Sequence, residues 1–440
     1  MKNNIKVRLD SRLIQPGEYF VPIEGEKVDG HRFIDVAIKN GAAGIIEEDK
    51  LYKIASGKLQ KINPFVIAIT GSVGKTTMRD FIFTILSQKY KVCKGSLNTK
   101  LGLAVNIVND MKYDDEVFVA ETGMDRAGEL LETGNFIRPN IAVITNVSRT
   151  HIEKLGSFEN IKKAKAELLQ TIRPGGSVFI NWDDQGARSL EAFVPKSVLI
   201  EKFGTQNGIA YNKKFVEKTI YDASLDPEEW YKFEEIPFKF IGRHNKILSI
   251  GAAAIGSYLK TPPFELRNGI LNLETPNGRL KLLEGVGGST LIDDTYNSSP
   301  VSACSALEAV SDYYNSFKLH GRKIAILGGM LELGDYEDEG HKLVGDVVSK
   351  FHFDILVLVG DLAVKIKKSL LLKDSSVTIN HYPDGISTGE FVKKTLKPQN
   401  GDIILVKASQ GIRLEKAVEI LMKDPKRASN LLVRQDARWK

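Results

Sequence analysis

The sequence predicts an α/β protein built from three domains, at 1–64, 65–275 and 276–440. Two observations predict this fold class. Short apolar runs alternate with longer amphipathic stretches, a pattern typical of parallel strands joined by helices, because parallel strands need long crossover connections. The chain also has 440 residues, of which 42% are hydrophobic. That length and composition exclude a disordered or fibrous protein and suit roughly two to four hydrophobic cores.

The segment before Pro64 has the pattern of a small α/β module. Its short apolar runs are separated by turns rich in Gly, Pro and Asp. The run HRFIDVAIKNGA predicts a helix over 31–42.

The second and third domains are predicted from buried strands that precede helices. The central strands are expected at 65–70, 116–122, 141–147 and 176–182, with helices at 75–90, 127–136 and 158–172. A helix rich in small residues, and therefore tightly packed, is expected at 244–259. Strands of the third domain are expected at 323–329, 354–360 and 402–408. This order predicts a mainly parallel central sheet with helices on both faces.

Charge, cysteine content and hydropathy indicate the kind of partner and the compartment to expect. The net charge is +6, and residues 423–440 contribute four of those charges with six basic and two acidic side chains. The rest of the chain is nearly neutral, so we expect no nucleic-acid partner. Two cysteines, Cys93 and Cys304, cannot form a disulfide framework and suit a reducing compartment. With no apolar run of about 20 residues, we expect a cytoplasmic protein without a membrane span, and a monomer.

The loop GSVGKTT, between a predicted strand and a predicted helix, has the pattern of a phosphate-binding loop. Gly71 and Gly74 let backbone N–H groups turn toward phosphate oxygens, and the helix adds its N-terminal dipole. Lys75 would reach the β- and γ-phosphates, and Thr76 would bind Mg²⁺. Glu121 ends the next predicted strand, where a carboxylate could meet the same ion. The loop residues expected to bind nucleotide are Gly71, Ser72, Val73, Gly74, Lys75, Thr76 and Thr77.

Several motifs, taken in order, resemble the ATP-dependent Mur ligase family. They are TGSVGKTT (70–77), ETGMDRAGE (121–129), ITNVSRTHIEKLGS (144–157), KAKAELL (163–169), GRHN (242–245), NGRL (277–280), DDTYNSSP (293–300) and MLELGD (330–335). The family's loop also lacks the first glycine of the general pattern, a position occupied here by Ile69. The resemblance implies a UDP-sugar-binding domain, a central P-loop ATPase domain and a C-terminal Rossmann-like domain that binds the amine substrate.

The resemblance also implies the reaction, a ligation through an acyl phosphate that releases ADP. The motifs most resemble those of the family member that adds D-alanyl-D-alanine to UDP-N-acetylmuramoyl-tripeptide. That reaction supplies peptidoglycan, the cell-wall polymer on which cell shape and division depend. Two Mg²⁺ sites are implied, with metal ligands Thr76, Glu121, His151 and a carbamylated Lys165. The implied catalytic residues are Lys75, Glu121, His151 and Lys165. By its sequence position alone, Lys165 would be a solvated helix lysine, so the carbamate requires a desolvated pocket that lowers its pKa.

Further contacts are implied residue by residue. The implied substrate contacts are Ser11, Arg12, Asn98, Thr99, Tyr296, Asn297 and Lys407. The implied nucleotide contacts beyond the loop are His244, Asn245, Arg279 and Asp294.

Four positions depart from the family pattern, namely Leu248, Gly329, Ala408 and Gln410. Leu248 replaces an Asn on the adenine side, and the other three lie in motifs that bear on the amine. Two alternatives therefore stay open: an amide ligase of the same superfamily with another UDP-sugar peptide or amine, and a P-loop switch protein without ligase activity.

Overall fold

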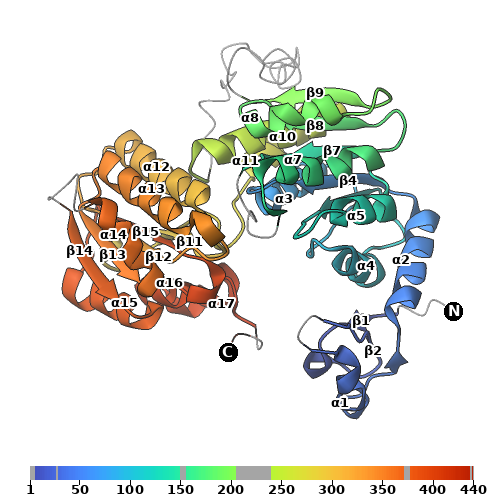
Figure 1. Ribbon diagram of the computed structural model, residues 1–440, viewed down its shortest axis with the longest axis horizontal. Coiled ribbons are helices and arrows are strands. Elements are labelled where there is room, and N and C mark those ends of the chain that lie inside the picture. The colour runs from blue at the N-terminus through green and yellow to red at the C-terminus, as the bar shows by residue number, and fades with distance from the viewer. Residues whose placement is uncertain are drawn as a thin grey trace. The chain divides into compact units, whose positions relative to one another are not determined.

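The computed structural model describes residues 5–25, 28–148, 155–204, 239–370, 377–436 and 439. The chain divides into two compact units (Figure 1). The first comprises 1–147, 162–222 and 251–269, and the second comprises 148–161, 223–250 and 270–440. Each unit contains a six-stranded sheet, and the first also contains a three-stranded one.

The small module at the start of the first unit is a parallel sheet with one short helix. Its strands are β1 (Val7–Arg8), β2 (Tyr19–Phe20) and β3 (Gly44–Ile45). The helix predicted over 31–42 is a 3-10 turn at Gly30–Phe33 that continues into α1 (Ile34–Lys39). Ile14, Phe20 and Ala37 form its core. The longer α2 (Glu48–Ile62) leads to the central sheet.

The central sheet is parallel throughout, in the order β5-β6-β4-β7-β8-β9. The four predicted strands are confirmed as β4 (Phe65–Thr70), β6 (Val117–Glu121), β7 (Ile141–Ile144) and β8 (Ser177–Asn181). The edge strands β5 (Val92–Lys94) and β9 (Leu199–Phe203) were not predicted.

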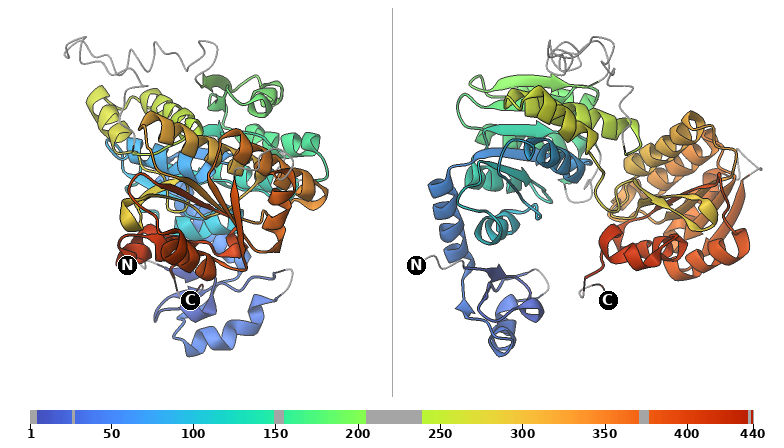
Figure 2. Two further views of the ribbon diagram at one scale, coloured as in Figure 1. Left: turned by 90° about the vertical axis from the view of Figure 1, so that its left-hand side faces the viewer. Right: turned by 180° about the vertical axis from the view of Figure 1, so that it is seen from behind.

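Helices cover both faces of this sheet (Figures 1 and 2). They are α3 (Lys75–Leu86), α4 (Lys100–Asn109), α5 (Glu129–Ile137), α7 (Phe158–Ala166), α8 (Gln185–Arg188), α10 (Arg243–Tyr258) and α11 (Pro263–Leu271). The tight packing predicted for α10 is confirmed, because a Cβ added at Gly251 would lie 2.8 Å from Met78 of α3.

The second unit has a mixed sheet in the order β10-β11-β15-β12-β13-β14, in which only β10 is antiparallel to its neighbour. The three predicted strands are confirmed as β12 (Lys323–Gly328), β13 (Ile355–Val359) and β15 (Ile403–Lys407). The unpredicted strands are β10 (Lys281–Glu284), β11 (Thr290–Asp294) and β14 (Thr378–Tyr382).

Two hydrophobic cores lie on opposite faces of this second sheet. One face is covered by α12 (Pro300–Ser316), α13 (Glu337–Lys350) and α14 (Val364–Leu370). The other is covered by α15 (Gly385–Phe391), α16 (Glu415–Leu421) and α17 (Ala428–Leu431). This arrangement confirms the predicted α/β fold class.

Two further expectations concern membrane-spanning helices and the two cysteines. No helix among the residues that the structure describes is long and apolar enough to cross a membrane. Both thiols are free; Cys93 is buried and Cys304 is half-buried. Burial raises the pKa of Cys93 to about 12 and that of Cys304 to about 11, so both thiols stay protonated at neutral pH.

Candidate active site

The loop between β4 and α3 has the backbone of a phosphate-binding loop. Gly71 and Gly74 have φ values of 150° and 82°, and a Cβ at Gly71 would lie 2.0 Å from the Thr145 hydroxyl. Only glycine fits so close an approach. Asn146 holds the loop open by accepting hydrogen bonds from the backbone N–H groups of Ser72 (3.1 Å) and Val73 (2.8 Å). The Lys75 ammonium donates to the Gly71 carbonyl at 2.9 Å, so it lies over its own loop.

Two of the four predicted metal ligands, Thr76 and Glu121, lie in contact. Ile69 of β4 pairs with Glu121 of β6, so the carboxylate lies beside the residue that leads into the loop. The Thr76 hydroxyl, in the first turn of α3, donates to Glu121 Oε2 at 2.9 Å. A hydroxyl and a carboxylate are oxygen ligands of the kind Mg²⁺ prefers, so this pair fits the implied ion.

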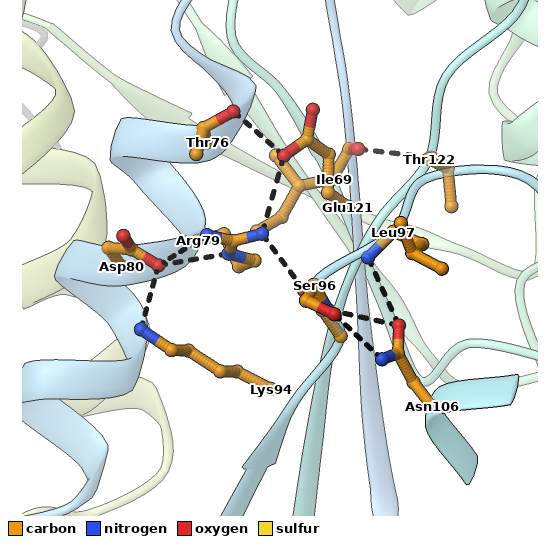
Figure 3. Close-up of polar contacts among 11 residues, drawn as sticks. Ile69, Thr76, Arg79, Asp80, Lys94, Ser96, Leu97, Asn106, Glu121 and Thr122 are labelled. Atoms are coloured by element: carbon orange, nitrogen blue, oxygen red, sulfur yellow. Dashed lines mark hydrogen bonds and ion pairs between the residues drawn. The ribbon is translucent and has the colours of Figure 1, made fainter. Parts of the chain in front are cut away.

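A buried arginine that the sequence did not single out adjoins this pair (Figure 3). Arg79, one turn along α3, lies with Nη1 3.7 Å from Glu121 Oε2. Its Nη1 also donates to the Gly95 carbonyl at 2.9 Å, and its Nε donates to Asp80 at 2.9 Å. Lys94 pairs with the same Asp80 carboxylate at 3.2 Å. Arg79 therefore connects Glu121 with the start of the 96–102 loop.

Two asparagines shape the loop that carries Asn98 and Thr99. Asn106 accepts hydrogen bonds from the backbone N–H groups of Ser96 and Leu97, each at 3.0 Å (Figure 3). The Asn98 carbonyl accepts from Gly123 N–H at 2.7 Å, and its side chain is exposed. Thr99 caps α4, because its hydroxyl accepts from Gly102 N–H. The Thr99 hydroxyl thus has a structural role in addition to the contact implied for it.

Lys165 is the buried member of a lysine-rich helix. Only 2% of its surface is exposed, whereas Lys163 is exposed and Lys162 is half-buried. Burial and the nearby positive charge of Lys75 lower the pKa of Lys165 well below its usual value. Lys165 is thus no solvated helix lysine, and the expected desolvated pocket is present.

The amino-terminal residues predicted to contact substrate lie in a turn capped by Asp10. Ser11 is buried, and its carbonyl accepts a hydrogen bond from Asn40. The Arg12 guanidinium is exposed and pairs with the Asp10 carboxylate at 2.7 Å. Asp10 raises the pKa of Arg12.

The second unit brings its predicted residues to the carboxyl ends of β11 and β15. Asp294 pairs with Lys407 in the strand register, and the two side chains form a buried ion pair of 2.7 Å. Lys407 also donates to the Asn297 carbonyl at 3.0 Å. Burial lowers the pKa of Lys407, against the opposing effect of Asp294. Lys407, the last residue of β15, therefore holds both the end of β11 and the loop that follows it.

His244 and Arg279 belong to the same electrostatic group. Burial lowers the pKa of His244 to about 4, with Asp294 opposing and Lys407 adding to the effect. The Arg279 guanidinium lies 4.0 Å over the ring of Tyr296, which is 43% exposed. Within the described part of the chain, the buried Arg279 Nε has no hydrogen-bond partner. Asn245 is buried and donates to the Ile241 carbonyl at 2.8 Å, so its amide is engaged within the protein.

The departures from the family pattern have distinct surroundings. Ala408 is buried, and Gln410 is exposed. A Cβ at Gly329 would lie 2.8 Å from Leu362, so this position is too tight for an acidic residue without movement of that side chain. Leu248 is buried.

One predicted ligand, His151, lies outside the described residues. In the described ranges, no three His, Cys, Asp or Glu side chains gather as a metal site. Three residues that sequence reasoning missed also contact the site loops: Arg79, Asp293 and Arg434. Only Asp293 could have been found, since it lies within the DDTYN motif.

Three comparisons with known proteins bear on this site. The family models "Mur ligase family, catalytic domain", "Mur ligase middle domain" and "Mur ligase, glutamate ligase domain" match residues 6–86, 69–256 and 278–410. The UDP-N-acetylmuramoyl-tripeptide–D-alanyl-D-alanine ligase of Bacillus subtilis (strain 168) is 29% identical, over 95% of this chain and 93% of that protein. The ligase of the same name from Escherichia coli (strain K12) is 26% identical, over 95% and 94%.

Solved structures agree in fold. The MurF ligase of Thermotoga maritima in complex with ADP is 26% identical, with a TM-score of 0.75 over 97% of this chain and all of that one. MurF from Acinetobacter baumannii has a TM-score of 0.78 at 23% identity, over 95% and 93%.

Proposed function

The chain belongs to the Mur ligase family, and we propose that it is the ATP-dependent ligase that joins D-alanyl-D-alanine to UDP-N-acetylmuramoyl-tripeptide during peptidoglycan precursor synthesis. The relatives of that name match nearly the full length of this chain. The observation that carries the proposal is the phosphate-binding loop with Thr76 hydrogen-bonded to Glu121, together with the burial of Lys165 in the same unit. Two free, protonated thiols suit the cytoplasm, where we place the reaction.

The proposed reaction has two steps. A carboxylate oxygen of the tripeptide attacks the γ-phosphorus of ATP, ADP leaves, and an acyl phosphate forms. The amine of D-alanyl-D-alanine then attacks the acyl carbon, loses a proton, and expels inorganic phosphate. The loop N–H groups and Lys75 hold the ATP phosphates in line with the attacking carboxylate, so catalysis rests mainly on positioning and charge neutralisation.

Mg²⁺, when bound, would neutralise the phosphate oxygens during transfer. Thr76 and Glu121 would hold one ion, and His151 with a modified Lys165 would hold a second. The modification is a carbamate, formed when the neutral Lys165 amine attacks CO₂ and releases a proton. Burial favours that neutral amine, because desolvation disfavours the ammonium form.

Substrate contacts are proposed for loops around each sheet. Ser11 and Arg12 would bind the UDP end, and Asn98 and Thr99 would bind the phosphate or sugar. In the second unit, Arg279 and Asp294 would bind the phosphates and ribose, with His244 and Asn245 at the adenine. The residues proposed for the amine substrate are Tyr296, Asn297 and Lys407.

The test supplies ATP, Mg²⁺, UDP-N-acetylmuramoyl-tripeptide and a panel of amines, and detects the amide by mass spectrometry. We expect D-alanyl-D-alanine to give the highest kcat/KM. A second candidate, a ligase for another amine, is favoured by the exposed Gln410 in place of an Arg suited to a carboxylate. Turnover of another amine, with none for D-alanyl-D-alanine, would establish that second candidate.

A further inference from the structure

The C-terminal segment of the second unit contacts three loops of that unit, at 277–279, 294–297 and 408–414, which carry or directly follow predicted nucleotide and substrate residues. We call residues 430–436 with Trp439 the C-terminal clasp. The Asn430 carbonyl accepts a hydrogen bond from Asn277 at 2.9 Å. Val433 lies so close to Gly278 that a Cβ there would come within 2.9 Å of it. The clasp thus begins against the loop that holds Arg279.

Arg434 makes the central contacts of the clasp. Only 6% of its side chain is exposed. Its Nη1 donates to the Thr295 carbonyl and to Glu415 Oε2, both at 3.0 Å. Its Nη2 donates to the Tyr296 carbonyl. One guanidinium therefore binds the 294–297 loop to the residue that begins α16.

Glu415 connects the clasp to the loop that follows β15. Its side chain is 1% exposed and lies between two guanidinium groups, those of Arg413 and Arg434. Arg413 also donates to the Trp439 carbonyl at 3.1 Å, and its guanidinium lies 5.0 Å over the Trp439 ring. Through Arg413, the 408–414 loop thus contacts both Glu415 of α16 and Trp439 of the clasp.

Backbone conformation agrees with a fixed arrangement. Arg413 and Arg434 have φ values of 60° and 58°, in the left-handed region that residues other than glycine rarely occupy. Such conformations persist where the surrounding structure over-determines them. Here the hydrogen bonds of the two guanidinium groups supply that constraint.

We propose that the C-terminal clasp positions the nucleotide and amine loops of the second unit, and that Arg434 is its positioning residue. The inference rests on the proposed function, which assigns Arg279 and Asp294 to ATP and Tyr296, Asn297 and Lys407 to the amine. Arg434 touches none of the reacting atoms and acts through the Thr295 and Tyr296 carbonyls. A guanidinium is needed because one planar fork reaches two carbonyls and a carboxylate, whereas a lysine ammonium is a point charge.

The test compares Arg434→Lys with Arg427→Lys, a matched control at an exposed position of the same basic segment. We expect Arg434→Lys to raise KM for ATP and for D-alanyl-D-alanine at least about fivefold, on the order of one lost charge-assisted hydrogen bond. KM for UDP-N-acetylmuramoyl-tripeptide should stay within about twofold, because its proposed contacts lie in the first unit. Arg427→Lys should leave all three KM values unchanged.

Hydrogen exchange gives a second readout that needs no turnover. In the unliganded full chain, Arg434→Lys should speed amide exchange in peptides covering 294–298 and 408–414, while peptides of the central sheet stay as in the unmodified chain. Unchanged KM values and unchanged exchange would overturn the proposal. A lower kcat with all three KM values unaltered would also overturn the proposal. That result is expected if Arg434→Lys only reduces the fraction of enzyme that is folded. If the unmodified chain makes no amide, the proposed function fails, and the exchange experiment still tests the clasp.

Discussion

The burial of Lys165 distinguishes it from neighbouring lysines that the sequence pattern does not separate. KAKAELL contains two lysines and Lys162 precedes it, and no helical pattern distinguishes them as ligands. The structure does distinguish them, because Lys165 alone of the three is buried. The family resemblance selected Lys165, and the burial supplies the physical reason a carbamate could form there.

Replacing this lysine tests its proposed role. Lys165→Ala should lower kcat at least about a hundredfold, since it removes an anion proposed to hold Mg²⁺ at the phosphates. Short carboxylates such as acetate should restore part of the activity by entering the vacated space. Lys163→Ala, on the exposed side of the same helix, is the matched control and should keep normal kcat. A fully active Lys165→Ala enzyme would contradict the carbamate.

Asp293 gives a prediction about pH. Its Oδ1 accepts from Thr295 N–H and hydroxyl, while within the described residues its buried Oδ2 has no partner. Burial raises the pKa of Asp293 to about 6 from an ordinary 3.8. The folded state therefore binds this proton more tightly than the unfolded state does. The protonated Asp293 carboxyl contributes stability that is fully present below about pH 4 and is lost as pH rises through 6.

Asp293→Asn removes this penalty while keeping the Oδ1 acceptor. We expect it to raise the free energy of unfolding of the second unit above pH 7 by on the order of 2 kcal/mol. Near pH 4 the variant and the original chain should differ little. Urea titrations at both pH values measure the effect, and an equal difference at the two pH values would count against it.

Among the elements, buried strands with continuous apolar runs were predictable, whereas the edge strands and the interior strand β11, whose sequence TLIDD ends in two acids, were not. β4, β6, β7 and β8 are continuous apolar runs because both of their faces are covered. β9 and β14 lie at sheet edges with largely exposed or half-buried residues, so their sequences lack such a run. The site also depends on strand register, because Ile69 pairs with Glu121 and Asp294 pairs with Lys407. These pairings follow from which strands become neighbours, and a single sequence does not show that.

Arg79 lies at the junction of α3 with the 96–102 loop. Arg79→Leu removes a buried group that contacts Glu121, Asp80 and Gly95. We expect affinity for Mg²⁺-ADP, measured by calorimetry, to fall about tenfold, because the Glu121 carboxylate loses the neighbouring positive charge that holds it in place. Lys94→Ala breaks another ion pair to Asp80 without contact to Glu121 and is the control. If the two substitutions lower the affinity for Mg²⁺-ADP equally, the loss comes from the contact with Asp80 and not from the contact with Glu121.

At the scale of the whole molecule, net charge was a poor guide to partners. The basic C-terminal segment supplies most of the +6, yet Arg434 is buried in an ion pair with Glu415. In the sequence this segment stood out only for its charge, whereas in the structure it forms α17 and then contacts three loops. Hydropathy could not reveal these contacts, because they depend on backbone carbonyls brought together by the fold.

If the chain activates a carboxylate through an acyl phosphate, an oxygen atom of that carboxylate is transferred to the released phosphate. UDP-N-acetylmuramoyl-tripeptide labelled with ¹⁸O in its reacting carboxylate is incubated with ATP, Mg²⁺ and D-alanyl-D-alanine, and the released phosphate is analysed by mass spectrometry. We expect one ¹⁸O atom in each inorganic phosphate formed with an amide. Amide formation with phosphate free of the label, or with the label in AMP, would contradict it.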